Sequence, residues 1–301
     1  MIGHRTSPPS GPTGPGWILG SALALGLLLV AHTADAYCRS TTCTGTCARD
    51  ADGCKTEGHP LYWTSMCVGF SIQEDGSEWI PFSEVERVIA ESFVAWSDLP
   101  CTDGNATIAF SRAADVACHQ AEYNLDGANA NIVMFQDHKW DYTGPNNTLA
   151  KTTVTYDNET GEILDADIEM NHAFNEYTTS DDYVVYDLQA ILTHEIGHLI
   201  GLDHSPYLSA TMEAGYQQGS TDERFLDQDD VDGVCAVYPP GRDAVCDTRP
   251  KGGFTGECTT SGSGEEEDGG CSVARAAPPQ SRLALLALAS LLCGAVLRRR
   301  R

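Results

Sequence analysis

One run of eleven residues constrains this chain more than any other: residues 194–204 read His-Glu-Ile-Gly-His-Leu-Ile-Gly-Leu-Asp-His. An α-helix repeats every 3.6 residues, so His194 and His198 lie on one face and their imidazoles can converge on one Zn²⁺. Gly201 lets the chain leave the helix, because glycine enters left-handed conformations without steric cost. His204 can then return as a third ligand. Three protein ligands leave one position for water, which is the pattern of catalytic rather than structural zinc.

Glu195 is the candidate general base of this site. It directly follows the first ligand, so it cannot share that ligand's direction, but it can hold and deprotonate a water on the metal. In this interpretation the Zn²⁺ lowers the pKa of the water toward about 7, and Glu195 passes the proton to the leaving amine. The alternative is an amphipathic core helix with two surface histidines. The glycine and the third histidine at the required spacing count against that alternative.

A methionine follows the motif in the segment Ser209-Ala210-Thr211-Met212. With Met212 in that place, the chain resembles the metzincins, whose pattern has a methionine turn after the third histidine. The run of residues 201–205, Gly-Leu-Asp-His-Ser, narrows the resemblance to the matrixins, the branch similar to matrix metalloproteinases. The resemblance covers about residues 59–240. It implies a zinc endopeptidase acting on proteins or peptides, and an α+β fold with a twisted mixed sheet packed on two long helices plus a C-terminal helix.

The same resemblance assigns roles to residues beyond the methionine. Tyr216 stands where the family has the tyrosine of its substrate-pocket wall, although Ala214 replaces the usual proline there. Asp229 and Asp230 correspond to the acid pair of the final helix. By the resemblance, this pair ties that helix to the N-terminus and to the methionine turn, which is a structural role.

Matrixins also carry a second, structural zinc held by three histidines upstream of the active-site helix. Here only His138 could correspond, since Lys151 stands where the family has histidine and Asp167 replaces another. We therefore predict that this structural zinc is missing. A nearby acidic run could hold Ca²⁺ instead, because hard oxygen ligands suit that ion, but we favour a solvated acidic face. The run consists of Asp157, Glu159, Asp165, Asp167 and Glu169.

The N-terminal segment has the features of an export signal. Residues 18–30 are strongly apolar, Arg5 precedes them, and Ala34-Asp35-Ala36 follows. This pattern predicts a secretory signal peptide, residues 1–36, cleaved after Ala36, with a membrane anchor as the alternative. An exported chain reaches the cell surface or the extracellular space.

The cysteines then read as a disulfide framework, since export favours disulfides over thiol chemistry. Of the 12 cysteines, ten lie between residues 37 and 270. Cys101 and Cys118 flank a strand-like run, so we expect them to pair. If they do and no thiol stays free, parity requires a bridge from the five N-terminal cysteines to the three C-terminal ones. Residues 37–58 would form a small stapled cap; zinc binding there lacks a paired Cys-x-x-Cys spacing. The two groups are Cys38, Cys43, Cys47, Cys54 and Cys67, and Cys235, Cys246 and Cys258.

Hydrophobic periodicity places the secondary structure of the catalytic region, residues 59–240. Ser83 and Glu86 have the spacing of a capping box for the first helix. Its buried stripe should comprise Val85, Val88, Ile89, Ser92, Phe93 and Trp96. The segment 157–161 reads as a hairpin turn between two strands. We expect strands at residues 61–73, 105–111, 130–136, 151–156 and 163–170, and helices at residues 81–96, 186–201 and 225–233.

The C-terminal part changes character twice. Residues 241–270 are rich in Gly, Ser and acidic side chains, which predicts a flexible linker. The tail, residues 271–301, begins with Cys271 directly after Gly270 and continues with an apolar run at 283–297 and four arginines. This tail resembles a myxobacterial-type sorting signal, which implies processing near Cys271 and retention at the cell envelope or release. A plain anchor is the alternative, although fifteen apolar residues fall short of the roughly 20 that span a bilayer.

The net charge of −25 excludes nucleic acid and anionic membrane surfaces as partners. The sequence as a whole predicts a monomeric, exported zinc endopeptidase. Two alternatives stay open at this point: a hydrolase acting on cell-wall peptide, and a non-catalytic surface binding module with the same fold.

Overall fold

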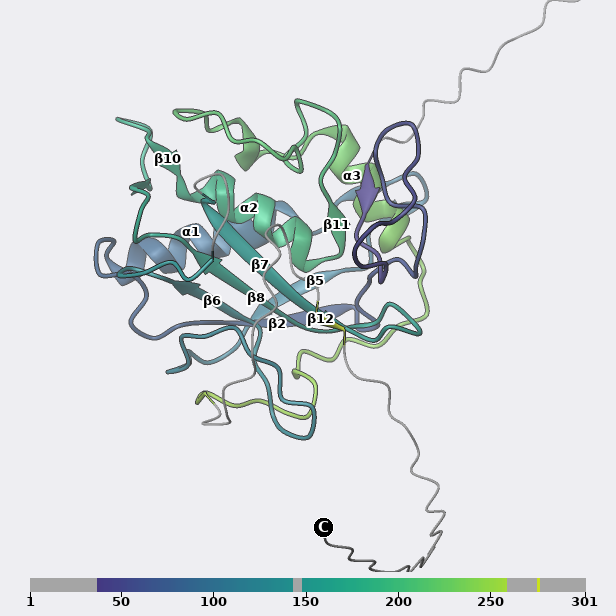
Figure 1. Ribbon diagram of the computed structural model, residues 1–301, viewed down its shortest axis with the longest axis horizontal. Coiled ribbons are helices and arrows are strands. Elements are labelled where there is room, and N and C mark those ends of the chain that lie inside the picture. The colour runs from purple at the N-terminus through teal and green to yellow at the C-terminus, as the bar shows by residue number, and fades with distance from the viewer. Residues whose placement is uncertain (1–36, 143–147, 259–274, 277–301) are drawn as a thin grey trace, which may run out of the picture. The chain divides into compact units, whose positions relative to one another are not determined.

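The computed structural model describes residues 37–142, 148–258 and 275–276 (Figure 1). The predicted signal peptide and nearly all of the predicted sorting tail lie outside these residues. The helices are α1 (Phe82–Ala95), α2 (Leu188–Leu199), α3 (Gln228–Val237) and the 3-10 helix η1 (Asp222–Arg224). The strands are β1 (Cys38–Arg39), β2 (Cys67–Ile72), β3 (Pro100–Cys101), β4 (Gly104–Asn105), β5 (Ala109–Arg112), β6 (Ile132–Phe135), β7 (Ala150–Tyr156), β8 (Ile163–Met170), β9 (Tyr177–Thr178), β10 (Tyr186–Asp187), β11 (Leu202–Asp203) and β12 (Arg275–Ala276).

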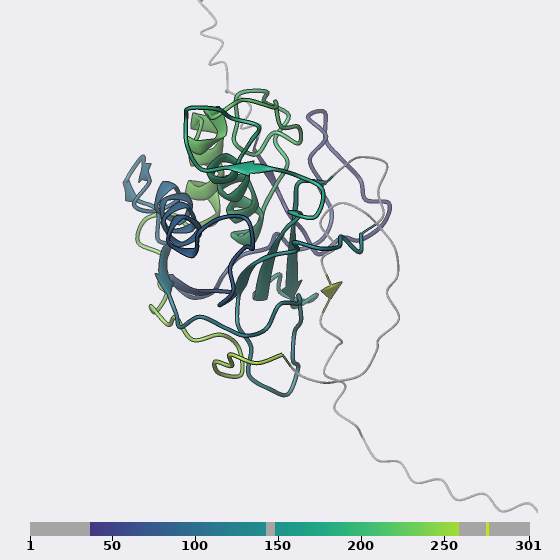
Figure 2. The same cartoon turned by 90° about the vertical axis from the view of Figure 1, so that its left-hand side faces the viewer.

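A mixed sheet is the centre of the fold. Its strands run in the order β12-β7-β8-β6-β2-β5, and only β7 and β8 pair antiparallel. The helices α1 and α2 pack against each other and against one face of this sheet (Figures 1 and 2). This arrangement confirms the predicted α+β architecture. The predicted hairpin between β7 and β8 is also confirmed, with the turn closed between Asp157 and Gly161.

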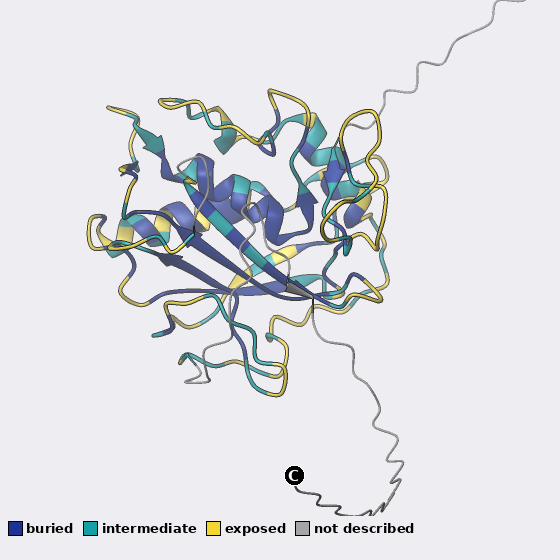
Figure 3. Ribbon diagram, in the orientation of Figure 1, coloured by how far each residue is buried: buried dark blue, intermediate teal, exposed yellow. Residues whose placement is uncertain are grey.

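The strand β8 divides the interior because side chains alternate along it. Ala166, Ile168 and Met170 point into the core beneath the helices. On α1, the predicted stripe is confirmed, from Val85 to the fully buried Trp96. All eight residues of β8 are buried, including the acids between the apolar residues (Figure 3).

Three of these acids correct a prediction. Asp165, Asp167 and Glu169 do not form a solvated acidic face; they are buried on the sheet face away from the helices. Asp167 accepts hydrogen bonds from the backbone of Ile132 and Glu122. The apolar residues between the acids pack into the core and keep the strand inside the protein. Alternation directs the carboxyls to the opposite face of the sheet, where loops cover them instead of solvent.

Several element ends also differ from the sequence prediction. Ser83 does not cap α1, because the backbone already accepts helical hydrogen bonds at Pro81 and the helix begins at Phe82. The strand predicted at residues 61–73 corresponds to β2, which begins at Cys67 rather than at residue 61. The predicted strand at 105–111 is split, since Ala106 and Thr107 bond to Leu99 and Tyr238 instead of to the sheet.

Five disulfides are present, and they correct one pairing. Cys101 does not bond Cys118; it bonds Cys235 in α3, which packs against β3, and Cys118 bonds Cys258. The other three bridges are Cys38–Cys54, Cys43–Cys47 and Cys67–Cys246. The last of these does join the N-terminal to the C-terminal group, although the premise of the parity argument was wrong. Partners 134 and 140 residues apart leave no local trace in the sequence.

Residues 241–258, which we call the strap, also differ from expectation. They were predicted as part of a flexible linker, but they lie along the sheet and are held at several points. The Ser65 hydroxyl contacts the backbone at both Val245 and Asp247. Gly69 leaves room for the strap, because a Cβ there would lie 2.1 Å from the Thr248 carbonyl. Two of the disulfides fasten the strap as well, at Cys246 and Cys258.

Within the described residues, no helix has the length and apolar character needed to cross a membrane.

Candidate active site

Helix α2 supplies the central residues of the site, and its start is firmly fixed. Asp187 caps the helix by accepting a hydrogen bond from the Ala190 amide at 2.8 Å. Arg224 binds both carboxylate oxygens of Asp187, which is 0% exposed. The helix therefore begins at Leu188, two residues later than predicted. Its first turn is tied to η1 through Arg224.

Gly201 ends the helix as predicted. Its φ is 92°, and a Cβ at this position would lie 2.6 Å from the Leu61 carbonyl oxygen. Only glycine fits both the conformation and the space. The chain then forms β11, which pairs with β1 of the N-terminal cap, residues 37–58. His204 follows directly, so the cap helps to hold the segment that returns the third histidine.

The three predicted ligands converge. His198 Nε2 lies 3.1 Å from His194 Nε2 and 3.2 Å from His204 Nε2. Three nitrogens on a tetrahedral zinc, each at about 2.0–2.1 Å from the ion, lie roughly 3.3 Å apart, so the spacing fits. The described residues contain one other cluster with metal-ligating spacing, Cys118, Glu122 and Cys258, and its two sulfurs form a disulfide.

The other ring nitrogens have partners that fix the orientation of two rings. His194 Nδ1 lies 2.7 Å from the Thr211 carbonyl oxygen, and His198 Nδ1 lies 3.0 Å from the Leu202 carbonyl oxygen. A carbonyl accepts a hydrogen bond from Nδ1–H, so the proton of the neutral ring stays on Nδ1 and the Nε2 lone pair is left for a metal. Burial lowers the pKa of His194 well below its ordinary value, lowers that of His198 to about 3, and lowers that of His204. The neutral rings are in the form that binds a metal, so the donor set fits zinc.

Glu195 lies next to these rings and is 7% exposed. Burial raises the pKa of its carboxyl to about 7, although a hydrogen bond from Thr152 acts in the opposite direction. The Thr152 hydroxyl lies 2.5 Å from Glu195 Oε2. Sequence reasoning missed Thr152, because a threonine in a strand carries no local signal of a contact with a helix 43 residues later.

Met212 lies under the site in a turn that the acid pair holds. It is buried, and a Cβ at Gly197 would lie 2.1 Å from its sulfur, so the turn packs directly on α2. Asp230 accepts hydrogen bonds from the Thr211 and Met212 amides. Burial raises the pKa of Asp230 to about 6.

The other acid, Asp229, links the same helix to the cap. It accepts a hydrogen bond from the Ser205 hydroxyl at 2.6 Å and another from the backbone of Tyr37. The contacts implied by the resemblance, from the acid pair to the methionine turn and to the N-terminal segment, are therefore present.

Tyr216 is partly buried and belongs to the loop after the methionine turn. Its hydroxyl donates to the Ser220 carbonyl at 2.6 Å and accepts from the Asp187 amide at 2.9 Å. The residue therefore anchors this loop to the start of α2. Its predicted place in the wall of a substrate pocket stays a prediction.

The residues considered for a second zinc do not come together. His138 is exposed and bonds Glu78, while Lys151 lies over the Tyr142 ring at 3.2 Å. Asp167 is engaged by backbone amides, as described above. The absence of a structural zinc stays a prediction.

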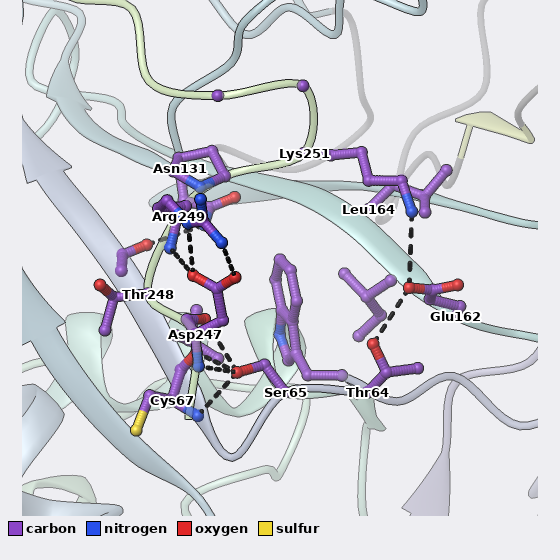
Figure 4. Close-up of a pocket in the computed structure, with 17 residues that line it drawn as sticks. Thr64, Ser65, Cys67, Asn131, Glu162, Leu164, Asp247, Thr248, Arg249 and Lys251 are labelled. Atoms are coloured by element: carbon purple, nitrogen blue, oxygen red, sulfur yellow. Dashed lines mark hydrogen bonds and ion pairs between the residues drawn. The ribbon is translucent and has the colours of Figure 1, made fainter. Parts of the chain in front are cut away.

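A cavity of about 350 Å³ lies between the strap and the sheet, away from the histidines (Figure 4). Its rim carries two ion pairs, Asp247–Arg249 and Lys251–Glu162. None of the residues that converge on the candidate metal centre lines this cavity.

The family model of matrixin matches residues 62–239 of this chain. The chain belongs to the matrixin family. This matrixin is 30% identical over 171 residues to the human neutrophil collagenase, which covers 56% of this chain and 32% of that protein. It is 25% identical over 192 residues to the interstitial collagenase of the horse, with 63% and 35% covered. The chain spans about a third of the length of the curated relatives it matches.

The matrixins are a family of metalloproteases whose catalytic metal is zinc, and the three histidines of this chain could hold such an ion. The matched range leaves out both the cap and the strap. The cap contains two complete disulfides, Cys38–Cys54 and Cys43–Cys47, and the strap contributes one cysteine to each of two others, Cys67–Cys246 and Cys118–Cys258. Those disulfides are consistent with an oxidising compartment outside the cytosol.

Proposed function

We propose that this matrixin is an exported zinc endopeptidase that hydrolyses peptide bonds inside protein substrates. The observation that carries the proposal is the convergence of three Nε2 atoms from His194, His198 and His204, with the buried Glu195 directly after the first of them on α2. Three neutral imidazoles and one adjacent carboxyl form a donor set suited to zinc-assisted hydrolysis. The matrixin model matches residues 62–239, the region that holds these residues, and the similarity to collagenases supports the same reaction class.

The three histidines would hold the metal through Nε2. When bound, Zn²⁺ supplies a Lewis acid that polarises the substrate carbonyl and makes a water more acidic. The Nδ1 contacts of His194 and His198 with backbone carbonyls keep their rings aimed at one point. Burial keeps the rings unprotonated, so protons do not compete for the Nε2 lone pairs at neutral pH.

Glu195 would act as general base and then as general acid. It takes a proton from the attacking water and delivers it to the nitrogen of the leaving amine. A buried carboxyl whose pKa lies at about 7 is suited to both transfers near neutral pH. Met212 supports the floor of the site, and Tyr216 would line the substrate pocket.

The proposal extends to the setting of the enzyme. Signal-peptide cleavage after Ala36 would release a chain that begins with the cap, and processing of the tail at 271–301 would lead to retention of the enzyme at the cell envelope or to its release. The disulfide framework supports export. We propose that the enzyme acts as a monomer on protein or peptide substrates.

The test is digestion of casein and gelatin by the purified chain, with and without a chelator. We expect cleavage that the chelator abolishes and added zinc restores. Glu195→Ala is the matched control: it should keep one zinc per chain and lose most turnover, because the ligands remain and the proton acceptor is gone.

Two outcomes would contradict the proposal. Inertness toward proteins together with cleavage of cell-wall fragments would assign the enzyme to wall peptide. Zinc binding without hydrolysis of either substrate would leave a binding module on the same fold. An active Glu195→Ala variant would remove Glu195 from its role.

A further inference from the structure

Thr152 lies where strand β7 meets helix α2, and the proposed function assigns it no role. Its side chain is 2% exposed. Its hydroxyl lies 2.5 Å from Glu195 Oε2 and 3.1 Å from the Glu195 carbonyl oxygen. A hydroxyl has one proton to donate, and the shorter distance assigns that proton to the carboxyl oxygen.

The position of this hydroxyl is rigid. Threonine is β-branched, so its χ1 angle is restricted within a strand. The backbone of β7 pairs with β8 along its length, with Thr152 opposite Ile168. Ala150 and Val154, on the same face of β7, belong to the core into which α2 packs. The donor therefore has a fixed place relative to the helix that carries Glu195.

The carboxyl depends on this donor. Among the described residues, Thr152 is the only one whose side chain is found to hydrogen-bond Glu195; the backbone of Thr152 contributes a second hydrogen bond to the same carboxyl, which a side-chain substitution leaves in place. A glutamate has several rotatable bonds, and without a partner its carboxyl would sample more than one direction. Water cannot replace the hydroxyl easily, because both side chains are buried.

We propose that Thr152 is a positioning residue for peptide hydrolysis: its hydroxyl holds Oε2 of Glu195 and thereby leaves Oε1 to receive the proton of the attacking water. This role rests on the proposed function. It concerns the direction of the carboxyl rather than the binding of metal or substrate. Removal of the hydroxyl should therefore lower kcat and leave KM and zinc content unchanged.

Three variants separate the hydroxyl from the rest of the side chain. Thr152→Val keeps the shape and removes the donor, while Thr152→Ser keeps the donor. Thr153→Val is the matched control on the same strand, because the Thr153 hydroxyl is buried and has no hydrogen-bond partner among the described residues. With a peptide substrate, we expect Thr152→Val to lower kcat by about 10- to 100-fold, as misplacement of a catalytic group does.

The remaining readouts exclude a merely structural role. KM of Thr152→Val should stay within about twofold, which marks a loss confined to the transition state. Metal analysis should return one zinc per chain for every variant. Thr152→Ser should recover most of the lost kcat, and Thr153→Val should resemble the wild type. Equal losses in Thr152→Val and Thr153→Val, or no recovery with Thr152→Ser, would overturn the proposal.

A second measurement does not depend on activity. In the metal-free protein, denaturant midpoints of the wild type, Thr152→Val, Glu195→Ala and the double variant form a double-mutant cycle. We expect the shifts to be non-additive, because the two side chains touch. Additive shifts would show that the contact does not exist and would overturn the role. If the wild type binds zinc but cleaves no protein, both the proposed function and the role of Thr152 are refuted. If the wild type is active and Thr152→Val is equally active, only the role of Thr152 is refuted.

Discussion

The sheet buries ionisable side chains on both of its faces, and the two sets differ in the partners they have. On the helix side, His194, His198 and Glu195 each have a hydrogen-bond partner, and the free histidine nitrogens aim at one point. On the opposite side, Asp165 and Asp167 are equally buried, but Asp165 Oδ1 has no partner among the described residues. Burial lowers the pKa of the histidines and raises that of both aspartates, so both sets tend toward the neutral form.

This difference separates a reactive site from a buried cluster. The histidine side chains are oriented so that an ion at one place satisfies all of them. The carboxyls of Asp165 and Asp167 lie beside each other. Burial raises the pKa of both; the charge of Asp167 raises the pKa of Asp165 further, while a hydrogen bond from Asp165 acts to lower the pKa of Asp167. Burial alone is therefore not the mark of function; the convergence of the three Nε2 atoms on one point is what distinguishes the histidines.

The largest effect should come from the helix side. His198 lies between the other two imidazoles, so His198→Ala should abolish both zinc binding and casein cleavage. Asp167→Asn, a substitution at an equally buried group on the other face, should leave both intact. Metal analysis and the casein assay check this prediction. Retention of zinc by His198→Ala would contradict the assignment of the ligands.

On the opposite face, removal of a charge should stabilise the protein. Asp165→Asn puts an amide donor beside the Asp167 carboxylate and removes the need to bury two acids together. We expect the free energy of unfolding at pH 7 to rise by about 1–3 kcal/mol, the usual cost of an unmet buried polar group. Urea unfolding measures this change. A loss of stability of similar size would show that Asp165 has a favourable charged partner in the folded state.

The same comparison predicts a dependence on pH. Because burial raises the pKa of Asp165 in the folded state, the folded chain holds a proton that the unfolded chain releases above about pH 4. The contribution of this group to stability is complete below that pH and is lost as pH rises through the raised folded value. The stability difference between Asp165→Asn and the wild type should therefore be smallest in acid and grow with pH. A difference that shrinks as pH rises would show that interactions in the folded state lower this pKa.

Calcium should give the smallest effect. In the part of the chain that the structure describes, no third carboxylate lies within ligand distance of both Asp165 and Asp167. We therefore expect millimolar Ca²⁺ to leave the thermal midpoint of the wild type unchanged. A rise of several degrees that Asp165→Asn abolishes would establish instead the calcium site that the sequence suggested as an alternative.

The convergence of the three histidines could be predicted from the sequence because their spacing is local. His194, His198 and Gly201 lie within eight residues of one another, so helix geometry alone brings the two rings together. Met212 and the β7–β8 hairpin follow the same logic of short separation. Thr152 and the partners of Cys101 and Cys118 could not be predicted, because pairing across more than 40 residues is decided by how strands and loops stack. The prediction that Asp165 lies on a solvated face was wrong for a different reason. The alternation of the strand was visible in the sequence, but the loops that cover its outer face were not.

Titration of the metal-free chain with zinc, followed by casein cleavage at each addition, tests the central claim most directly. The account predicts that activity rises linearly and reaches its plateau at one zinc per chain, and that His198→Ala shows neither binding nor activity. Cleavage by the metal-free chain, or activity that appears only after a second equivalent has bound, would contradict the assignment of one catalytic zinc to His194, His198 and His204.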